Sequence, residues 1–503
     1  MESKITPIEQ ALGLIRDGAT IAVSGAWMLV PDAVLAKLGE RFQNGGRPRD
    51  LTAVFLLCPG GTPDQPGIEH LAREGMLRRV VGGSFPNLPE SRLRRLIAEN
   101  RIEAYNVPAG MVACWLRETG ARRAGALSRR GLGTFADPRL EGGRMNEAAK
   151  ADLLSLARLN GEEYLFWPRG EVDVALLRAT AADEAGNLSM EGEPATLAAF
   201  VMASAARASG GKVIVQVKRV VPVGTLHPHQ VKVPGTLVDC VVVEEEALQA
   251  GGIRYDGSLC GETRAPLLPA AQAPAVDHWI ASRALREVLR GDTVVVGYGV
   301  AALVPHLLLE AGRFEEAQFA IEQGSTGGLP LTGFGFGSSR NPAVILDAAS
   351  QFDLFQGSCF DLGMLSFLQV DGQGRVNVHR LDARPSLSAG IGGFTDIAAS
   401  ARRLVFLGTL TAGGLEVEIR ECAVRIVREG RMKKFVSRLD HVSYDPTYGS
   451  AERVLYITER AVFRWQGGKV ALVELAPGVT AEEDVLPQME FLPQTVTPAA
   501  WGA

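Results

Sequence analysis

Cysteine is scarce in this sequence, and no two cysteines stand close together. The 503 residues include six cysteines and no CxxC pair, which excludes a small disulfide framework and gives no sign of a zinc site. Histidine is nearly as rare, with seven residues. His227 and His229 flank a proline without a nearby set of carboxylate or cysteine ligands, so we expect no bound metal.

The chain also lacks long hydrophobic runs and an excess of positive charge. No stretch approaches the roughly 18 uninterrupted apolar residues of a membrane span. The opening MESKITPIEQALGLIRDG has no basic region followed by an apolar one, as a secretion signal would. We therefore expect a cytoplasmic protein without a membrane partner. The 52 Lys and Arg against 57 Asp and Glu give a formal net charge of −5, which argues against a nucleic-acid partner.

The length and the order of the apolar segments predict an α/β protein of two domains. A chain of 503 residues exceeds what one hydrophobic core normally organises. Residues 20–25 (TIAVSG) precede the amphipathic stretch 31–42 (PDAVLAKLGERF), and residues 293–299 (TVVVGYG) precede 304–314 (VPHLLLEAGRF). A strand, a glycine turn and a helix in this order are typical of βα units, whose parallel sheets are covered by helices.

Two pairs of similar segments recur in the same order along the chain. Gly18-Ala-Thr20 and Gly291-Asp-Thr293 each open an apolar strand. Asp183-Glu-Ala-Gly186-Asn187 and Asp371-Gly-Gln-Gly374-Arg follow further on. This order predicts two related domains with doubly wound, mostly parallel sheets, the first enlarged by an insertion.

The segment between the two predicted domains has the composition of a linker. Residues 264–277 (RAPLLPAAQAPAVD) are rich in proline and alanine and have neither strand alternation nor a clear helix face. We therefore expect one domain over residues 1–263 and the other over residues 278–503.

Glu322 is the carboxylate that the sequence singles out for chemistry. It follows the strand-like run Phe319-Ala-Ile and stands in Glu322-Gln-Gly324-Ser-Thr-Gly327-Gly328, a turn crowded with glycines. Glycines permit close approach of a ligand to the backbone and unusual φ angles. They favour a catalytic carboxylate over the alternative, a carboxylate that caps a helix or is solvated in a loop.

Two further glycine-rich stretches are ambiguous by themselves. Residues 333–339 (GFGFGSS) lack the GxGxxG spacing and an acidic ribose partner downstream, so we expect a flexible loop rather than a dinucleotide site. Residues 390–394 (GIGGF) have backbone N–H groups that could line an oxyanion site.

Taken together, these segments resemble the family of short-chain coenzyme A transferases, which includes propionate and acetate coenzyme A transferases and succinyl-CoA:3-ketoacid coenzyme A transferase. The resemblance extends from about residue 10 to residue 490, and the long single chain is most similar to the propionate or acetate type. Its most specific motifs are residues 102–106 (IEAYN), 131–143 (GLGTFADPRLEGG), the Glu322 loop, 350–353 (SQFD) and 390–394 (GIGGF).

The resemblance implies a role for particular residues. Glu322 would attack the acyl-CoA, and Gly392 or Gly393 would donate an N–H to the oxyanion. Coenzyme A, a substrate and not a permanently bound cofactor, would be held by Gly297, Tyr298, Gly299, Val300 and Ala301. The family also implies an active site at the interface of two doubly wound domains, and a homodimer or homotetramer.

The expected chemistry needs no ATP and no activating base. A glutamate of ordinary pKa, near 4.3, is ionised at pH 7 but is a weak nucleophile. Its attack on a thioester would give an acyl-glutamyl anhydride and CoA thiolate. The thiolate would then form glutamyl-CoA, from which an incoming acid recovers the coenzyme. The predicted reaction is the ping-pong transfer of coenzyme A between short-chain carboxylic acids.

Three segments depart from the usual family pattern and leave the acyl specificity open. Residues 108–110 are Pro-Ala-Gly where Pro-Gln-Gly is usual, and residues 356–361 are QGSCFD where a glycine-rich DGGGLD is usual. Residues 83–85 are Gly-Ser-Phe instead of a Gly-His-Trp-like segment. We expect all three to lie near loops that face the substrate.

Three other functions remain as alternatives. An acyl-CoA thioesterase on the same scaffold would let water resolve glutamyl-CoA. A non-catalytic ligand-binding or assembly protein would have kept the fold alone, although the intact Glu322 loop argues against it. A nucleotide-dependent oxidoreductase is disfavoured by the missing dinucleotide fingerprint.

Overall fold

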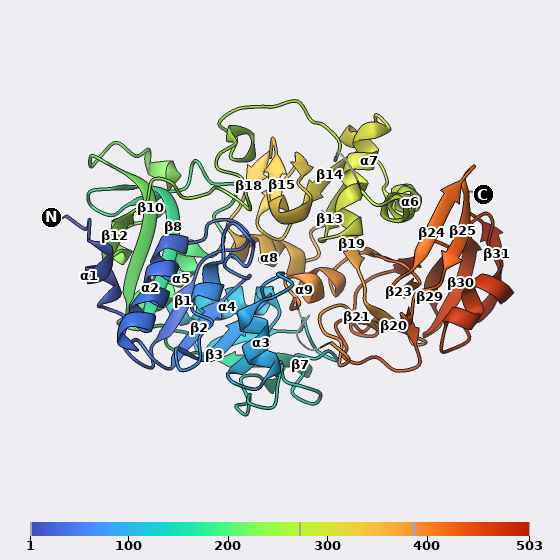
Figure 1. The fold of residues 1–503 in the computed structure, drawn as a ribbon, viewed down its shortest axis with the longest axis horizontal. Coiled ribbons are helices and arrows are strands. Elements are labelled where there is room, and N and C mark those ends of the chain that lie inside the picture. The colour runs from blue at the N-terminus through green and yellow to red at the C-terminus, as the bar shows by residue number, and fades with distance from the viewer. Residues whose placement is uncertain (1–2, 271–272, 385–388, 502–503) are drawn as a thin grey trace.

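The computed structural model describes residues 3–270, 273–384 and 389–501. It contains two large sheets, one in the first half of the chain (residues 3–263) and one in the second half (residues 278–501). Figure 1 shows the two halves side by side, with the ends of the chain at opposite sides of the molecule. No helix within the described residues is long and apolar enough to cross a membrane.

The first half contains a nine-stranded sheet whose main path is β11-β9-β8-β1-β2-β3-β4, with β10 and β12 added beside β8. Its strands are β1 (Thr20–Val23), β2 (Leu51–Phe55), β3 (Leu77–Gly82), β4 (Glu103–Asn106), β8 (Val174–Asp183), β9 (Leu188–Ser189), β10 (Lys212–Val221), β11 (Val231–Val233) and β12 (Cys240–Val243). All ten residues of β8 are buried, as expected of a parallel strand that helices cover on both faces.

The second half contains a ten-stranded sheet in the order β18-β15-β14-β13-β19-β22-β28-β29-β30-β31. Its strands are β13 (Asp292–Val296), β14 (Ala317–Ala320), β15 (Ser325–Thr326), β18 (Val344–Ile345), β19 (Leu362–Ser366), β22 (Arg403–Leu407), β28 (Arg453–Ile457), β29 (Ala461–Gln466), β30 (Lys469–Leu475) and β31 (Gln494–Ala500). Beyond β28 the sheet continues through the antiparallel strands β29 and β30.

Helices pack against both sheets, and α4 and α8 pack together where the halves meet. The α-helices of the described residues are α1 (Ile8–Leu12), α2 (Asp32–Gly45), α3 (Arg92–Ala98), α4 (Ala109–Gly120), α5 (Ala199–Ala208), α6 (Ala275–Ala284), α7 (Val304–Glu310), α8 (Ala348–Gln356) and α9 (Phe394–Ala398). The βα units that the sequence predicts are present as β1 followed by α2 and β13 followed by α7.

Smaller sheets lie around these two. They are formed by β5 (Gly125–Ser128), β7 (Glu162–Pro168) and β6 (Ser155–Leu159); β16 (Leu329–Pro330) and β17 (Ser339–Arg340); β21 (Val376–Asn377), β20 (Gln369–Asp371) and β27 (Phe435–Val436); β23 (Thr411–Ala412) and β26 (Met432–Lys433); and β24 (Glu416–Arg420) and β25 (Ala423–Arg428). The β5-β7-β6 sheet stands between β4 and β8 in the chain. The sequence predicts an insertion in the first half without giving its position.

Five parallel strands occur in the same order in both halves. Strands β2-β1-β8-β10-β12 of the first sheet match β14-β13-β19-β22-β28 of the second, in pairing and in direction. Each half has a buried aspartate that accepts hydrogen bonds from the amides two and four residues further on. Asp183 is the last residue of β8, the third strand of the first set, and Asp371 ends β20, which follows β19, the third strand of the second set. Gly186 and Gly374 supply the positive φ that both turns need. The predicted fold class, two related α/β units with mostly parallel sheets, is confirmed.

The predicted linker remains a proposal about where the domains divide. Residues 264–270 have no helix or strand, and α6 begins at Ala275 within the predicted segment. Residues 271–272 of that segment lie outside the described residues.

Candidate active site

Glu322 stands on a tight turn directly after β14, at the carboxyl end of a parallel strand. The Gly324 N–H donates to the Ile321 carbonyl over 3.1 Å, and the Ile321 N–H donates to the Ser325 carbonyl over 3.1 Å. Gly324 has φ of +119°, and a Cβ there would lie 2.2 Å from the Leu346 carbonyl oxygen. Only glycine fits this position. The turn holds the Glu322 carboxylate at the edge of the sheet, where open α/β sheets bind ligands.

The loop before α9 brings a backbone donor to this carboxylate. The Gly393 N–H donates to Oε2 of Glu322, and the side-chain amide of Gln323 lies 3.4 Å from Oε1. A Cβ on Gly393 would lie 2.5 Å from Oε2. Close packing of the carboxylate against this loop therefore requires glycine at position 393.

The neighbouring amide of Gly392 has a different partner. It donates over 2.7 Å to the carbonyl oxygen of Gly83, which also accepts from the Ile391 N–H over 2.9 Å and from Nδ2 of Asn106 over 2.7 Å. Gly83 and Asn106 belong to the first half, whereas Ile391 and Gly392 belong to the loop of the second half that leads into α9. The Gly83 carbonyl therefore joins the two halves directly beside Glu322.

A second carboxylate, Asp396 in α9, is buried behind Glu322. Its oxygens accept hydrogen bonds from the Gly110 N–H over 3.0 Å and from the side-chain amide of Gln356 over 2.9 Å. Burial raises the pKa of Asp396 to about 6, although these hydrogen bonds oppose the shift. A Cβ on Gly110 would lie 2.3 Å from Oδ1 of Asp396, so this contact too depends on a glycine.

Burial also changes the ionisation of Glu322. It raises the pKa of Glu322 to about 7, and the charge of Asp396 acts in the same direction. The hydrogen bond from Gly393 acts against the shift because it stabilises the ionised form. The expectation of an ordinary pKa near 4.3 is therefore wrong: at pH 7 a substantial part of Glu322 is protonated.

Glu322 lines a cavity of about 260 Å³ between the two halves. The lining of this cavity is mostly apolar and aromatic, and it comes from loops at the carboxyl ends of strands in both sheets. The lining residues are Ala26, Trp27, Leu57, Cys58, Ser84, Phe85, Asn87, Val296, Gly297, Tyr298, Glu322, Gln323, Phe336, Leu365, Ser366, Val378, Ala389, Gly390, Ile391, Gly392, Phe394 and Ile397.

Part of the segment predicted to hold coenzyme A reaches this cavity. Gly297 and Tyr298 line it, and Tyr298 packs edge to face against Trp27 and Phe336, with ring centroids 5.1 and 5.7 Å apart. Gly299, Val300 and Ala301 follow as the turn into α7 and are not among the residues that line the cavity. The role of this segment in binding the coenzyme remains a prediction.

The three departures from the family pattern occupy different places. Ser84 and Phe85 line the cavity. The Ala109 N–H donates to the Gly392 carbonyl over 3.0 Å, so residues 109 and 110 support the loop from behind. Ser358 and Cys359 do not line the cavity. Of the three departures, only the one at residues 83–85 therefore lies in the cavity that contains Glu322.

Several residues of the site could not be identified from the sequence. Asp396 looks like any acidic residue in the first turn of a helix, and Asn106 belongs to a recognisable motif without an evident role. Trp27 carries no motif at all. The only signal that could have indicated Trp27 is its position, two residues after the glycine turn that ends a predicted strand.

Comparison with known proteins shows the family. The profile of the Coenzyme A transferase family matches residues 5–244. The chain is 37% identical to acetate CoA-transferase YdiF of Escherichia coli K12, over 96% of this chain and 91% of that protein. It is 36% identical to caffeate CoA-transferase of Acetobacterium woodii, over 98% of this chain and 95% of that protein.

A solved structure agrees with this assignment over nearly the whole chain. The crystal structure of acyl-CoA transferase YdiF apoenzyme from Escherichia coli O157:H7 superposes with a TM-score of 0.92 at 35% identity, covering 99% of this chain and 95% of that one. The chain belongs to the coenzyme A transferase family. It is an enzyme of the CoA-transferase class, as the sequence predicts.

Proposed function

We propose that this enzyme transfers coenzyme A between carboxylic acids by way of a thioester on Glu322. The observation that carries the proposal is the Glu322 carboxylate itself, which lines the cavity between the halves and accepts a hydrogen bond from Gly393. It is the only carboxylate among the described residues that line this cavity.

The first half-reaction loads the coenzyme onto the enzyme. The ionised carboxylate of Glu322 attacks the acyl carbonyl of the donor thioester, and the carbonyl π electrons move onto oxygen. Collapse of this tetrahedral oxyanion breaks the carbon–sulfur bond and gives an acyl-glutamyl anhydride and CoA thiolate. The thiolate then attacks the glutamyl carbonyl and expels the first acid as its carboxylate, which leaves glutamyl-CoA.

The second half-reaction follows the same steps in reverse. An incoming carboxylate attacks glutamyl-CoA and releases CoA thiolate, which then attacks the acyl carbonyl of the new anhydride. The products are a new acyl-CoA and the free carboxylate of Glu322. One thioester is broken and one is formed, so no nucleotide is consumed and no net proton is transferred.

Gly393 is suited to stabilise the oxyanions of the two steps at the glutamyl carbonyl. Its N–H already points at Oε2 of Glu322, and that oxygen carries the negative charge when a thiolate or a carboxylate attacks the glutamyl carbon. A preorganised backbone donor of this kind is typically worth a few kcal/mol. The Gly392 N–H is taken by the Gly83 carbonyl, so we assign the oxyanion role to Gly393 and a positioning role to Gly392.

The coenzyme is proposed to approach along Gly297 and Tyr298, with the turn through Ala301 beside its arm. These two residues line the cavity, and Gly299 has φ of +97° with a Cβ position only 3.1 Å from Oγ of Ser366. A crystal structure of the Escherichia coli O157:H7 YdiF enzyme, which is 34% identical and has a TM-score of 0.91, contains a thioester complex with CoA. That relative supports coenzyme A as the substrate here.

The acid substrate is proposed to be a short-chain monocarboxylate of the acetate or propionate type. Among the described residues that line the cavity none is Lys, Arg or His. A second carboxylate on the acyl chain would therefore be buried without a cationic partner, which is costly. The two full-length relatives named above are named for acetate and for caffeate, both monocarboxylates, whereas subunits that match about half of the chain at 27–28% identity are named for succinyl-CoA and 3-oxoadipate.

The decisive experiment omits the acceptor acid. Enzyme incubated with an acyl-CoA alone is expected to accumulate CoA on the peptide that contains Glu322, detected by mass spectrometry. Hydroxylamine is expected to release CoA and leave a hydroxamate on that side chain. A label on a cysteine such as Cys359 would refute the proposal. Steady release of free CoA without an acceptor would indicate a thioesterase.

The assembly and the cellular location remain proposals from the sequence. We propose a homodimer or homotetramer in the cytoplasm, with domains that divide at residues 264–277. Light scattering of the purified protein measures the oligomeric state directly.

A further inference from the structure

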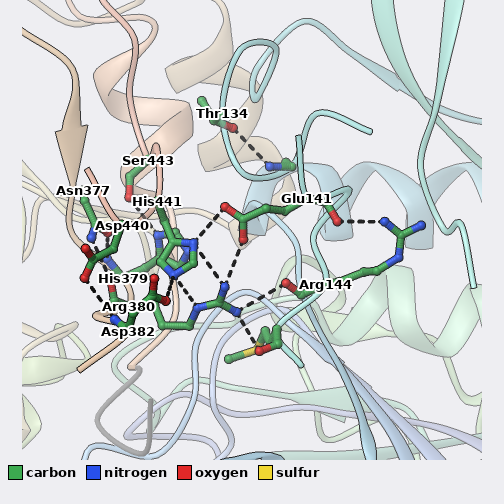
Figure 2. Close-up of polar contacts among 12 residues, drawn as sticks. Thr134, Glu141, Arg144, Asn377, His379, Arg380, Asp382, Asp440, His441 and Ser443 are labelled. Atoms are coloured by element: carbon green, nitrogen blue, oxygen red, sulfur yellow. Dashed lines mark hydrogen bonds and ion pairs between the residues drawn. The ribbon is translucent and has the colours of Figure 1, made fainter. Parts of the chain in front are cut away.

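The motif at residues 131–143 has no part in the chemistry described so far, yet it contacts the second half of the chain. Figure 2 shows Glu141 from this motif pointing toward Arg380 and His441. Oε2 of Glu141 lies 3.1 Å from Nη2 of Arg380, and Oε1 lies 2.8 Å from Nδ1 of His441. We call Glu141, Arg380 and His441 the inter-half clasp.

The clasp makes further polar contacts around Arg380 and His441. Nη1 of Arg380 donates to the Met145 carbonyl over 2.6 Å, and Nε of Arg380 lies 2.8 Å from Nε2 of His441. Nη2 of Arg380 also lies 3.1 Å from Nδ1 of His441. Asp382 also lies 3.0 Å from Nε2, at the exposed edge. The His441 side chain is 6% exposed and that of Arg380 is 14% exposed, so water screens these contacts poorly.

Arg380 lies in the stretch of chain between β21 and α9, of which residues 385–388 lie outside the described residues. Strand β21 ends at Asn377 and α9 begins at Phe394, and no helix is described between them. Nδ2 of Asn377 donates to the Arg380 carbonyl over 2.7 Å, which ties the start of this stretch to β21. Figure 2 shows Arg380 reaching from there toward Glu141 and the 144–145 backbone of the first half.

The motif that supplies Glu141 is also linked to the other end of the stretch. The Gly143 carbonyl accepts from the Asn106 N–H over 2.7 Å. The side chain of Asn106 in turn donates to the Gly83 carbonyl, the acceptor for the Gly392 N–H. One segment of the first half therefore supports both described ends of the stretch, at Arg380 and at Gly392.

We propose that Glu141 and Arg380 are positioning residues for the transfer reaction. The clasp holds the motif at residues 131–143 against the second half, and through Asn106 and the Gly83 carbonyl this motif supports the Gly392 amide, next to the Gly393 N–H that donates to Glu322. The inference rests on the proposed function of Glu322 and goes beyond it, since none of the three clasp residues lines the cavity. Loosening the clasp moves the Gly393 donor away from the carboxylate, and misplacement of a catalytic group by about 1 Å can cost on the order of 100-fold in rate.

The test uses the full chain with Glu141→Gln, Arg380→Gln and the double variant. Each single variant is expected to lower kcat about 10- to 100-fold while KM for the acyl-CoA changes little. Loss of the Gly393 hydrogen bond raises the pKa of Glu322, so the acid limb of the pH–rate profile is expected to move upward by about 0.5 unit or more. The double variant is expected to match the worse single variant, because both substitutions open one contact.

A matched control is Arg117→Gln, which removes another ion pair between the halves, the 2.6 Å contact of Arg117 with Asp353. It is expected to leave the acid limb in place. If Glu141→Gln does not fold, Arg380→Lys, which keeps the positive charge, takes its place. The same changes in kcat and in the acid limb of the pH–rate profile are then measured for it. Clasp variants with a lowered melting temperature but a wild-type kcat and acid limb would overturn the proposal. Thioester formation on Glu322 in these variants would leave the proposed function intact.

Discussion

Asp396 lies behind Glu322, and its negative charge adds to burial, the larger cause, in raising the pKa of Glu322. Both carboxylates are buried between the same two halves, and both have pKa values above their ordinary range. A carboxylate with a raised pKa is a stronger nucleophile once it is ionised. Its pKa also lies closer to a working pH near 7, which is where a catalytic group is most effective. The raised pKa of Glu322 therefore increases its nucleophilic strength and lowers the fraction of enzyme in which Glu322 is ionised.

Asp396→Asn is expected to move the acid limb of the pH–rate profile to lower pH. Removal of the Asp396 charge makes ionisation of Glu322 easier, and the Asn oxygen can still accept from the Gly110 N–H. The measurement is kcat/KM between pH 5 and 8. Asp353→Asn, at an exposed ion pair with Arg117, is the control. An acid limb that stays in place in Asp396→Asn would contradict the proposed charge effect.

Glu322→Gln is expected to abolish most turnover but to stabilise the fold at alkaline pH. The amide has a similar volume and is not a carboxylate nucleophile, so less than about a tenth of the activity should remain. The folded-state pKa of Glu322 is about 7 against an ordinary 4.5. Protonated Glu322 therefore makes its full contribution to the free energy of unfolding below pH 4.5. This contribution is lost as the pH rises through 7, which lowers the free energy of unfolding by at most about 3 kcal/mol.

Melting temperatures of the wild type and Glu322→Gln should then differ at pH 8 and converge near pH 5, with the variant higher at pH 8. Equal melting temperatures at both pH values would show that burial does not penalise the ionised form.

Gly393→Ala is expected to lower kcat/KM by about 100-fold or more, because its Cβ would lie 2.5 Å from Oε2 of Glu322 and 2.8 Å from the Phe352 ring. Steady-state kinetics measures this loss. Gly45→Ala at the end of α2, where a Cβ meets no atom within 4 Å, serves as the control and should leave activity unchanged. Similar losses in both variants would show that the site does not depend on close approach at Gly393.

Asn87→Lys is expected to improve the use of dicarboxylates. Asn87 lines the cavity, and a lysine there can pair with a second carboxylate of the acyl chain. With butyrate and succinate as acceptors of equal length, the ratio of their kcat/KM values should shift at least about 10-fold toward succinate. Asn87→Met has a similar length without charge and should not shift the ratio. A wild-type enzyme that already prefers succinate would refute the monocarboxylate proposal.

The position of Glu322 could be predicted because its signals are local. A strand-like run, a carboxylate and three nearby glycines lie within ten residues, and the structure has β14, a tight turn and a glycine with φ of +119° in that order. The repeated strand and turn segments likewise predicted two related α/β units, since each unit is built from neighbours in the chain, whereas the shared order of five strands is seen only in the structure.

The pKa of Glu322 and the different hydrogen-bond acceptors of the Gly392 and Gly393 amides could not be predicted in this way. The charge that acts on Glu322 comes from Asp396, and the carbonyl that occupies the Gly392 amide comes from Gly83 in the other half. These effects depend on how the halves dock, which no spacing in the sequence records. The apolar cavity around Glu322, which penalises ionisation, is assembled from both halves for the same reason.

The repeated architecture has a consequence for how the enzyme could be divided. Each half has its own parallel sheet, yet Glu322, the proposed nucleophile, stands on one half, and the Gly83 carbonyl that accepts from the neighbouring Gly392 amide stands on the other. A chain cut within residues 264–270, which have no helix or strand, would give two polypeptides that each retain a sheet and that lack a complete site. Activity would then be a property of the pair, and it would follow the concentration of the scarcer fragment.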